Sequence, residues 1–316
     1  MKKDITRFVL ALLITICLLA VVDLAVGFVG DRLAWNMPSF SGQIAKDNYR
    51  LHRMDAEVVI IGSSRGAHHY VTSQLNDSID NLVGRHVTVY NAAIQGKFAN
   101  SNCCAAEAIL SRYQPKLIIF DMPENQMQSY DIASDIDFSS PYYWSDTIVH
   151  RYLDNLGIKE RITMKSSLCR YNSKLFRILS SYLQNVPEDD GYAPMYGSSI
   201  DTLKQALIMA KDVDAPLNPY SVNNLVSVFN KAKTNGVPIV MVCSPRYRTN
   251  MTNYQLEELC NNYNVQFVDF CNSDLFNAHP EWFHDAGHMN DIGAHVYTGL
   301  FFETIKPKIE SIQFND

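Results

Sequence analysis

The sequence has no excess of positive charge: 27 lysine and arginine residues are outnumbered by 33 aspartate and glutamate residues, giving a net charge of −6. Binding to the phosphates of nucleic acid requires a basic surface, so this balance argues against nucleic acid as the main partner. Charged residues make up 19% of the chain and hydrophobic residues 47%, which is typical of a globular protein and not of a disordered one. The sequence also lacks internal repeats and low-complexity segments.

Motifs that hold metals or phosphates are missing as well. None of the seven cysteines belongs to a Cys-x-x-Cys pair or to a Cys/His cluster with the spacing of zinc ligands. No glycine-rich phosphate-binding loop is present either. We therefore expect no metal and no cofactor. Six cysteines follow the N-terminal segment, an even number that permits disulfides, although the spacing does not define their pairing.

The N-terminus carries a long apolar run, Phe8–Val29, which only Asp23 interrupts. This run is about long enough to cross the hydrocarbon core of a bilayer. Its length also resembles a signal peptide, but no small-x-small cleavage site follows it convincingly. Basic residues before the run favour insertion with the N-terminus inside: Lys2, Lys3 and Arg7. We expect residues 1–30 to be a signal anchor with the rest of the chain periplasmic or otherwise extracytoplasmic; a buried or amphipathic N-terminal helix is the alternative.

Short apolar segments alternate with amphipathic ones in the rest of the chain, which predicts a parallel β-sheet with helices on both faces. The predicted strands are residues 58–61, 87–90, 117–120, 237–243 and 265–270, and the predicted helices are residues 70–83, 99–113, 222–233, 253–263 and 288–305. We expect a connector at 31–55 and an α/β domain at 56–316. A long insertion at 126–219, with helical patches at 147–156 and 175–183, interrupts this domain after the third strand. Insertions of this length are more often lids or binding regions than linkers.

The first predicted strand ends in Gly62-Ser63-Ser64. Ligands of open α/β sheets bind at the carboxyl ends of the strands, so hydroxyl groups at this point face a cleft. The simpler interpretation is a βα turn with a serine helix cap.

A second group of polar residues lies near the C-terminus, at Asp285-Ala286-Gly287-His288. A carboxylate three residues before a histidine can accept a hydrogen bond from Nδ1 and leave Nε2 free to act as a general base. Such a base activates a serine hydroxyl. A lone histidine is more often a capping or packing residue. His284 is a second candidate for the base, because Glu281 precedes it by three residues.

These two blocks resemble those of the SGNH (GDSL-type) hydrolases. Residues 62–64 are similar to the Gly-Asp-Ser block of that superfamily, and residues 285–288 are similar to its Asp-x-x-His block. Asn290 and Gly293 continue the pattern in the His-x-Asn-x-x-Gly form of membrane-anchored, DltD-like and alginate-acetylation relatives. The resemblance covers roughly residues 58–125 and 237–305. It implies a flavodoxin-like, three-layer α/β fold with five parallel strands.

The resemblance also implies roles for individual residues. Ser64 is the expected nucleophile, with His288 as general base and Asp285 as its orienting carboxylate. Ser63 stands where the family has aspartate and is an alternative nucleophile. The oxyanion hole would use the backbone N–H of Ser64, Gly96 and Asn125, although residues 121–125 depart from the family's Gly-x-Asn-Asp block.

Further polar residues lie at the expected cleft. Arg65 and His68 follow the nucleophile, and Arg246 and Arg248 follow the fourth strand. All four are candidates for binding substrate: Arg65 and His68 could line the cleft, and Arg246 and Arg248 could bind an anionic glycan, since arginine pairs well with carboxylates. The alternatives are a solvated helix face for the first two and a solvated loop for the other two. Aromatic residues of the insertion, Tyr142–Trp144, could stack on sugars, but packing is their usual role.

Taken together, the sequence predicts an extracytoplasmic serine esterase or O-acyltransferase that acts on ester-linked acyl groups, most simply acetyl, of cell-surface polysaccharide. Two alternatives remain open. One is a non-catalytic cell-envelope protein that binds envelope partners and keeps only the fold. The other is a lipase or thioesterase with a pocket for a longer acyl chain.

Overall fold

A five-stranded parallel sheet organises the larger part of the chain. The computed structural model describes residues 2–38, 42–128, 132–184, 186, 189–199 and 215–314. The strands are β1 (Val58–Gly62), β2 (Val89–Asn91), β3 (Leu117–Asp121), β4 (Ile239–Cys243) and β5 (Gln266–Asp269). They pair in the order β2-β1-β3-β4-β5, and every pairing is parallel. The predicted sheet is therefore confirmed, with the flavodoxin-like strand order.

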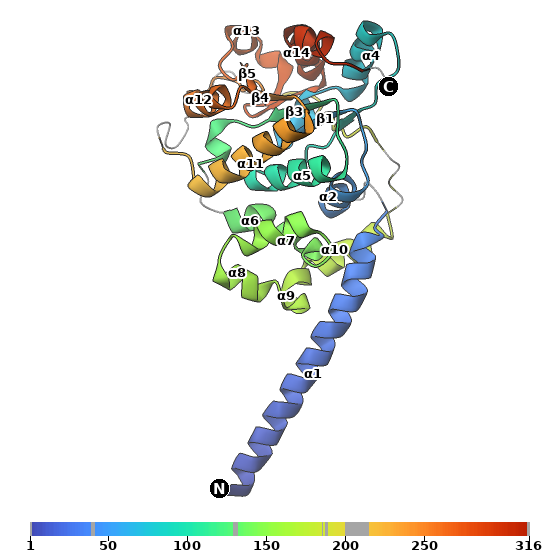
Figure 1. The fold of residues 1–316 in the computed structure, drawn as a ribbon, viewed down its shortest axis with the longest axis vertical. Helices are drawn as coiled ribbons and strands as arrows, with labels where there is room; N and C mark the ends of the chain where they lie inside the picture. Colours follow the sequence, from blue (N-terminus) through green and yellow to red (C-terminus); the bar gives the residue numbers. More distant parts are fainter. Residues whose placement is uncertain are drawn as a thin grey trace. The chain divides into compact units, whose positions relative to one another are not determined.

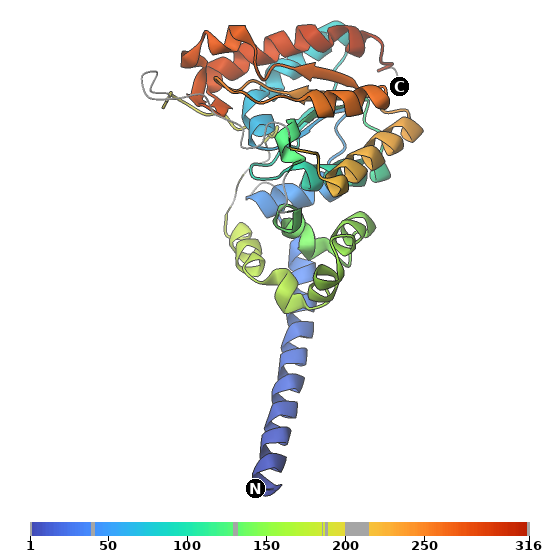
Figure 2. The same cartoon turned by 90° about the vertical axis from the view of Figure 1, so that its left-hand side faces the viewer.

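Helices cover both faces of this sheet (Figures 1 and 2). One face carries α4 (Thr72–Val83) and α14 (Asp291–Glu310), and the other carries α5 (Ala99–Arg112) and α11 (Pro219–Asn235). Strands β1, β3 and β4 are buried along their whole length, which explains why their sequences are continuous apolar runs. Their side chains form one core with residues of α4 and α14, among them Leu75, Tyr297 and Phe301.

Two predicted helices differ from the structure. The helix predicted at 70–83 is preceded by a separate short helix, α3 (Ser64–His69), and begins at Thr72. The helix predicted at 288–305 begins only at Asp291, and the preceding residues form a small antiparallel pair, β6 (Phe283–Asp285) and β7 (His288–Met289). Asn290 ends this pair and caps α14, because its Oδ1 accepts the amide of Gly293 at 3.0 Å.

Gly293 lies where α14 touches the segment before β6. A Cβ atom at this position would lie 2.1 Å from the carbonyl oxygen of Trp282. We expect Gly293→Ala to lower the free energy of unfolding by about 3 kcal/mol, since a backbone atom must move. Gly299→Ala on the same helix is the matched control: its Cβ would meet only the Gln74 side chain, at 3.5 Å, and should stabilise the helix by about 1 kcal/mol. Urea unfolding measures both, and equal stabilities would contradict the close contact.

The chain forms two compact units. The unit with the sheet comprises Tyr49–Asp135 and Pro187–Asp316, and the other comprises Met1–Asn48 and Ile136–Val186. The second, helical unit contains α1 (Lys2–Trp35), η2 (Asp137–Tyr142), α7 (Thr147–Asp154), α8 (Ile158–Thr163), α9 (Ser167–Tyr171) and α10 (Lys174–Ser181). The remaining elements are α2 (Gln43–His52), η1 (Glu124–Gln126), α6 (Ile132–Ile136), α12 (Tyr254–Asn262), α13 (Asp274–Asn277) and η3 (Pro280–Trp282).

Much of the predicted connector at 31–55 is therefore helical. Within the predicted insertion at 126–219, residues 136–186 belong to the same compact unit as residues 1–48. The aromatic side chains expected to meet sugars lie in this unit. Tyr142 and Tyr143 are each only 1% exposed, so they pack inside it, while Trp144 is exposed.

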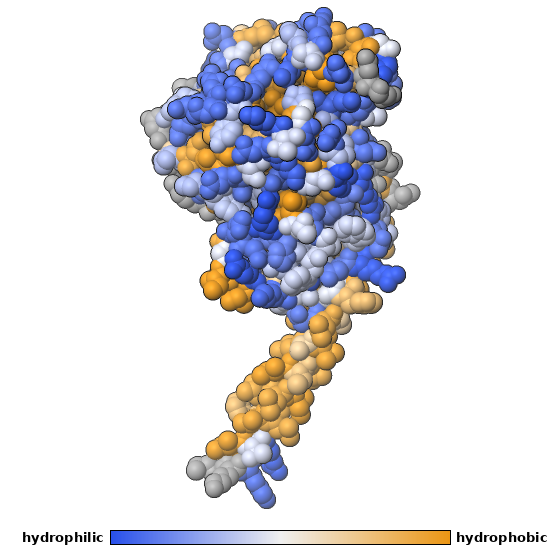
Figure 3. All heavy atoms as spheres, in the orientation of Figure 1, coloured by the Kyte–Doolittle hydropathy of each residue, from blue (hydrophilic) through white to orange (hydrophobic). Residues whose placement is uncertain are grey.

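Helix α1 is long and apolar enough to cross a membrane, and every residue from Lys3 to Val22 is exposed (Figure 3). A signal sequence near an N-terminus has the same length and composition.

Candidate active site

Ser64 is the first residue of α3, directly after the carboxyl end of β1. It is the one residue between Val58 and Tyr70 that is not buried. Ser63, the alternative nucleophile, is only 4% exposed and makes no capping hydrogen bond to α3. Gly62 allows the end of β1 to lie close to β3, because a Cβ atom there would lie 2.9 Å from the backbone oxygen of Asp121. The fold therefore presents the hydroxyl of Ser64, and not that of Ser63, at the surface.

The turn between β6 and β7 brings a histidine and a carboxylate to this hydroxyl. Nε2 of His288 lies 2.8 Å from Oγ of Ser64, and Nδ1 lies 3.0 Å from each carboxylate oxygen of Asp285. The turn itself is closed by Asp285, whose Oδ1 accepts the amides of Gly287 and His288 at 2.7 and 2.9 Å. This arrangement allows Nε2 to take the proton of Ser64 while Asp285 holds the imidazole in orientation.

The pKa of Asp285 supports this role for its carboxylate. Partial burial raises the pKa, but hydrogen bonds from the His288 side chain and from the Gly287 amide outweigh burial and hold it below the ordinary value. Asp285 therefore stays ionised at neutral pH and can stabilise the positive charge that His288 gains when it takes the proton of Ser64.

The alternative base, His284, lacks the carboxylate expected for it. Its Nδ1 lies 3.0 Å from the carbonyl oxygen of Tyr196, and the expected partner Glu281 instead pairs with His279 at 2.7 Å. Among the described residues, only His288 combines a carboxylate on Nδ1 with a serine on Nε2.

Two further histidines follow Ser64 on α3, and each contacts His288 or the strand that carries it. His69 is completely buried, and its Nε2 accepts the amide of Met289 at 3.0 Å, so it fixes the strand that carries His288. His68 was expected to bind substrate. It is only 6% exposed, lies edge-on to His288 with 5.5 Å between ring centres, and places Nδ1 against the carbonyl oxygen of Ala193.

The buried state of His69 makes stability depend on pH. Burial and then the nearby charge of Arg65 hold the pKa of His69 well below its ordinary value of about 6.5. As the pH falls, His69 is therefore protonated in the unfolded chain before it is protonated in the folded one. Its contribution to the free energy of unfolding is complete above about pH 6.5 and falls by about 1.4 kcal/mol for each pH unit below it. We expect His69→Gln, which keeps an acceptor for Met289 without titrating, to flatten the decline in urea midpoint between pH 7 and 5. Parallel declines in both proteins would contradict the prediction.

The segment 189–199 lies along the same edge of the sheet unit. Three backbone hydrogen bonds hold it there: the amides of Asn91, Ala193 and Ser199 donate to the carbonyl oxygens of Asp190, Ala67 and His284. Gly191 is required at the first of these contacts, since a Cβ atom would lie 1.8 Å from the Asn91 oxygen. Sequence reasoning missed this segment, because its bonds connect positions about 85–130 residues apart and follow no periodic pattern.

Arg65 was expected to bind substrate, but the structure buries it. It is only 7% exposed, and its Nη1 donates to the carbonyl oxygen of Ser244 at 2.8 Å. Asp121, 2% exposed, accepts the amide of the same Ser244 at 3.2 Å. Arg65 and Asp121 are thus held together behind the nucleophile through one residue, a structural arrangement that leaves Arg65 almost no surface for a substrate.

The other two arginines lie after β4. The amide of Tyr247 donates to the carbonyl oxygen of Ala286, so this loop borders the Asp285–His288 turn. Arg246 is half-buried and donates to the sulfur of Met251, while Arg248 is exposed and lies over the ring of Tyr247. In the described part of the chain, neither guanidinium contacts Ser64 or His288.

Of the residues expected to donate hydrogen bonds to the oxyanion, Gly96 has a free amide and Asn125 is not bonded to Ser64 in the part of the chain that the structure describes. The loop that carries Gly96 is docked on β1, because the amide of Ile94 donates to Gly62 at 3.1 Å. Gly96 is exposed, adopts a φ of 71°, and donates its amide to no acceptor in the described ranges. Asn125 is exposed on η1, and within the described residues no hydrogen bond joins it to Ser64. Its neighbour Glu124 accepts the first amides of α12 instead.

Residues that could hold a metal do not cluster in the part of the chain that the structure describes: no group of three histidine, cysteine or acidic side chains is positioned for one. All seven cysteines are free thiols, so the disulfides that the even number permits are not formed.

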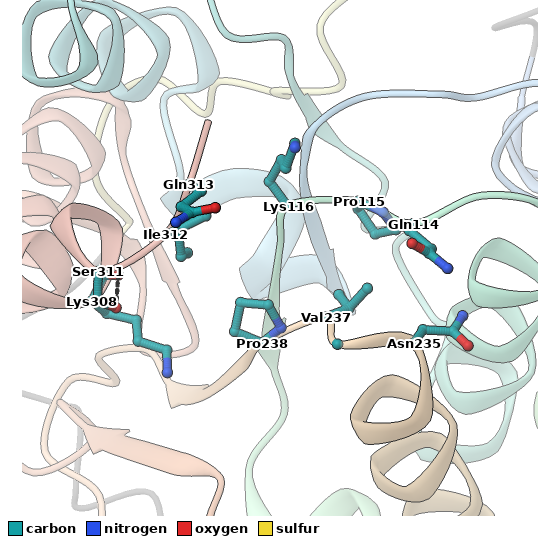
Figure 4. A pocket seen from close by; sticks show the side chains of 11 residues that line it. Gln114, Pro115, Lys116, Asn235, Val237, Pro238, Lys308, Ser311, Ile312 and Gln313 are labelled. Atoms are coloured by element: carbon teal, nitrogen blue, oxygen red, sulfur yellow. Dashed lines mark hydrogen bonds between the residues drawn. The ribbon is translucent and has the colours of Figure 1, made fainter. Parts of the chain in front are cut away.

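A cavity of about 540 Å³ lies at the amino ends of the strands, on the opposite edge of the sheet from Ser64 (Figure 4). Lys116, Pro238 and Lys308 are among its lining residues. A smaller cavity of about 290 Å³ lies nearer to His288, where Tyr196, Glu281 and Ile292 contribute to its lining.

No family model and no curated protein matches the sequence. Solved structures that resemble the chain path include the psychrotrophic esterase EstA from Pseudoalteromonas sp., inhibited by monoethylphosphonate, with 12% identity over 81% of this chain and 100% of that chain and a TM-score of 0.40. A GDSL-like lipase from Bacteroides thetaiotaomicron is 10% identical over 79% of this chain and 88% of that chain, with a TM-score of 0.35. These two neighbours are an esterase and a lipase at 10–12% identity, a similarity that concerns the chain path alone.

Proposed function

We propose that this chain is a membrane-anchored, SGNH-like serine hydrolase, either an esterase or an O-acyltransferase, acting outside the cytoplasm on acyl groups of cell-surface polysaccharide. The observation that carries the proposal is the chain of hydrogen bonds from Ser64 through His288 to Asp285. Oγ of Ser64 lies 2.8 Å from Nε2 of His288, and Nδ1 of His288 lies 3.0 Å from the carboxylate oxygens of Asp285. A purely structural histidine would not need both a partly exposed serine and a carboxylate at its two nitrogens.

The chemistry follows from this geometry. Nε2 of His288 takes the Oγ proton while Oγ of Ser64 attacks the acyl carbonyl carbon, and the amides of Ser64 and Gly96 are candidates to stabilise the oxyanion. When the tetrahedral intermediate collapses, the ester C–O bond breaks and the leaving oxygen takes the proton from Nε2. Water or a sugar hydroxyl then gives its proton to Nε2 and attacks the acyl-serine. When the second tetrahedral intermediate collapses, the bond between the acyl carbon and Oγ breaks and Oγ of Ser64 takes the proton back from Nε2.

The anchor has its own support. Three basic residues precede the exposed apolar part of α1, which favours an N-terminus in the cytoplasm and the Ser64 site outside it. A substrate at the cell surface fits this orientation.

Labelling and turnover of the full chain in detergent test the proposal. We expect a fluorophosphonate probe to label wild type and His284→Ala but not Ser64→Ala, and p-nitrophenyl acetate to be hydrolysed by the same two proteins. Absence of labelling and turnover in all three would favour the non-catalytic envelope protein instead.

A series of p-nitrophenyl esters separates the remaining candidates. Preference for acetyl over octanoyl esters, with acetate release from acetylated xylan, alginate or peptidoglycan, supports a glycan substrate. A preference for octanoyl esters supports the lipase or thioesterase. Product analysis with added sugar acceptors then separates transfer from hydrolysis.

A further inference from the structure

Helix α1 changes its surroundings at Asp23. Residues 3–22 are exposed throughout, whereas Asp23 and several later residues pack within the helical unit. At a rise of 1.5 Å per residue the exposed part is about 30 Å long, which equals the thickness of the hydrocarbon core of a bilayer. If α1 is the anchor of the proposed function, Asp23 marks the level at which the helix leaves the membrane.

Helix α9 is fixed to α1 at this level. The carboxylate of Asp23 accepts Oγ of Ser166 at 2.6 Å and the amide of Leu168 at 2.8 Å. Further along α1, Gly27 and Gly30 allow close contact with α9, because Cβ atoms at these positions would lie 2.4 and 2.7 Å from side-chain atoms of α9. The position of α9 relative to the exposed part of α1 is therefore set by direct bonds.

The surface of α8 and α9 is unusual for a helical unit in water. Ile158, Ile162 and Leu168 are 77%, 64% and 39% exposed within eleven residues of one another. Ile158 and Ile162 are four residues apart and share one face of α8. Three exposed basic residues accompany them: Lys159, Arg161 and Lys165. Figure 3 shows apolar side chains over α8 on the same unit that carries the apolar helix.

We propose that this α8–α9 surface (residues 158–168) is inserted into the lipid headgroup region of the membrane that α1 crosses. The apolar side chains would reach the acyl-chain boundary and the basic side chains would contact lipid phosphates, as in interfacial amphipathic helices. Lipid is favoured over a protein partner because Leu168 is bonded directly to Asp23, where the exposed part of α1 ends. The proposal rests on the membrane anchoring in the proposed function.

An exposed apolar residue just beyond the C-terminus of α10, Leu183, provides a control in the same unit. Leu183 is 88% exposed, but its neighbour Tyr182 bonds to the carbonyl oxygen of Leu33, ten residues beyond Asp23 on α1. That separation is about 15 Å along the helix axis. Leu183 should therefore remain in water although it is as apolar as Ile162.

Nitroxide labels on the full chain in phosphatidylcholine–phosphatidylglycerol vesicles test this inference. The exposed cysteines are Cys17 in α1 and Cys169 in α9, and the other five are buried. Labels are placed singly on Cys17, on Ile162→Cys and on Leu183→Cys, each with the remaining exposed cysteines changed to serine. Power saturation with oxygen and with a water-soluble nickel complex then compares the positions.

We expect oxygen to be the stronger relaxant at positions 17 and 162 and the nickel complex to be the stronger one at 183. A label at 162 that behaves like the one at 183, while 17 is in lipid, would overturn the inference and leave the anchor intact. Shielding of 162 from both relaxants would also overturn it and would indicate a protein partner. A water-accessible label at 17 would refute the anchor itself.

Discussion

Ser64→Ala is expected to lower kcat/KM for p-nitrophenyl acetate by on the order of 10⁴-fold or more, because loss of the nucleophile removes the entire covalent route. The hydroxyl of Ser64 is accessible and lies 2.8 Å from Nε2 of His288. Steady-state hydrolysis by the full chain measures the loss. The midpoint of thermal unfolding should not change, since the side chain of Ser64 is partly exposed and does not belong to the hydrophobic core.

Ser63→Ala is the matched control for this prediction. Ser63 is only 4% exposed and makes no capping bond, so its hydroxyl has access neither to substrate nor to a base. We expect its kcat/KM to stay within about threefold of wild type, less than 1 kcal/mol of transition-state free energy. Loss of activity in Ser63→Ala with retention in Ser64→Ala would reverse the two assignments and require a different arrangement of the β1–α3 turn.

His288→Ala is measured in the same experiment and should lower kcat/KM to a similar degree. Substitutions of residues that act together have effects on the rate that do not add. The double variant Ser64→Ala/His288→Ala should therefore be no slower than Ser64→Ala alone. A further large loss in the double variant would mean that the two residues act separately.

The parts of the fold that could be predicted are those in which one local pattern decides the structure. The strands were recognisable because β1, β3 and β4 are buried on both faces and so consist almost entirely of apolar residues. The link between Asp285 and His288 was likewise visible, since it spans only three residues. The start of α14 was not, because an apolar helical pattern does not reveal that Asp285 closes a turn and that Asn290 provides the cap.

Features that depend on distant parts of the chain were missed for a different reason. Residues 136–186 lie between β3 and β4, within the predicted insertion, but their clustering with residues 1–48 was not predicted; it is held by hydrogen bonds that Asp23 and Asp31 accept from α9. Arg65 was expected at the cleft because it directly follows Ser64 in the sequence. Ser244, which accepts its hydrogen bond, and Asp121, whose charge acts on it, lie 179 and 56 residues away in the sequence, so no local pattern predicts them.

Arg65→Met is expected to lower the free energy of unfolding by about 1–3 kcal/mol, because it leaves the buried carbonyl oxygen of Ser244 without its donor and removes the positive charge nearest to the buried Asp121. Burial raises the pKa of Asp121, and the charge of Arg65 and the bonds from Ser244 oppose that rise. Without Arg65 the carboxylate must either remain charged in the interior or take up a proton. Urea unfolding measures the loss, and Arg248→Met, at an exposed position, should change stability by less than about 0.5 kcal/mol.

A second substitution distinguishes the structural role of Arg65 from substrate binding. Asp121→Leu combined with Arg65→Met removes both buried charges, so we expect the double variant to regain a large part of the lost stability. A substrate-binding arginine would behave differently: Arg65→Met would raise KM at unchanged stability, and removing Asp121 would restore nothing. Since Arg65 is 7% exposed and bonded to Ser244, KM for a small ester should stay near the wild-type value in whatever fraction of Arg65→Met remains folded. Through their hydrogen bonds to Ser244, Arg65 and Asp121 thus hold the β1–α3 turn, which carries Ser64, against β3 and the loop after β4.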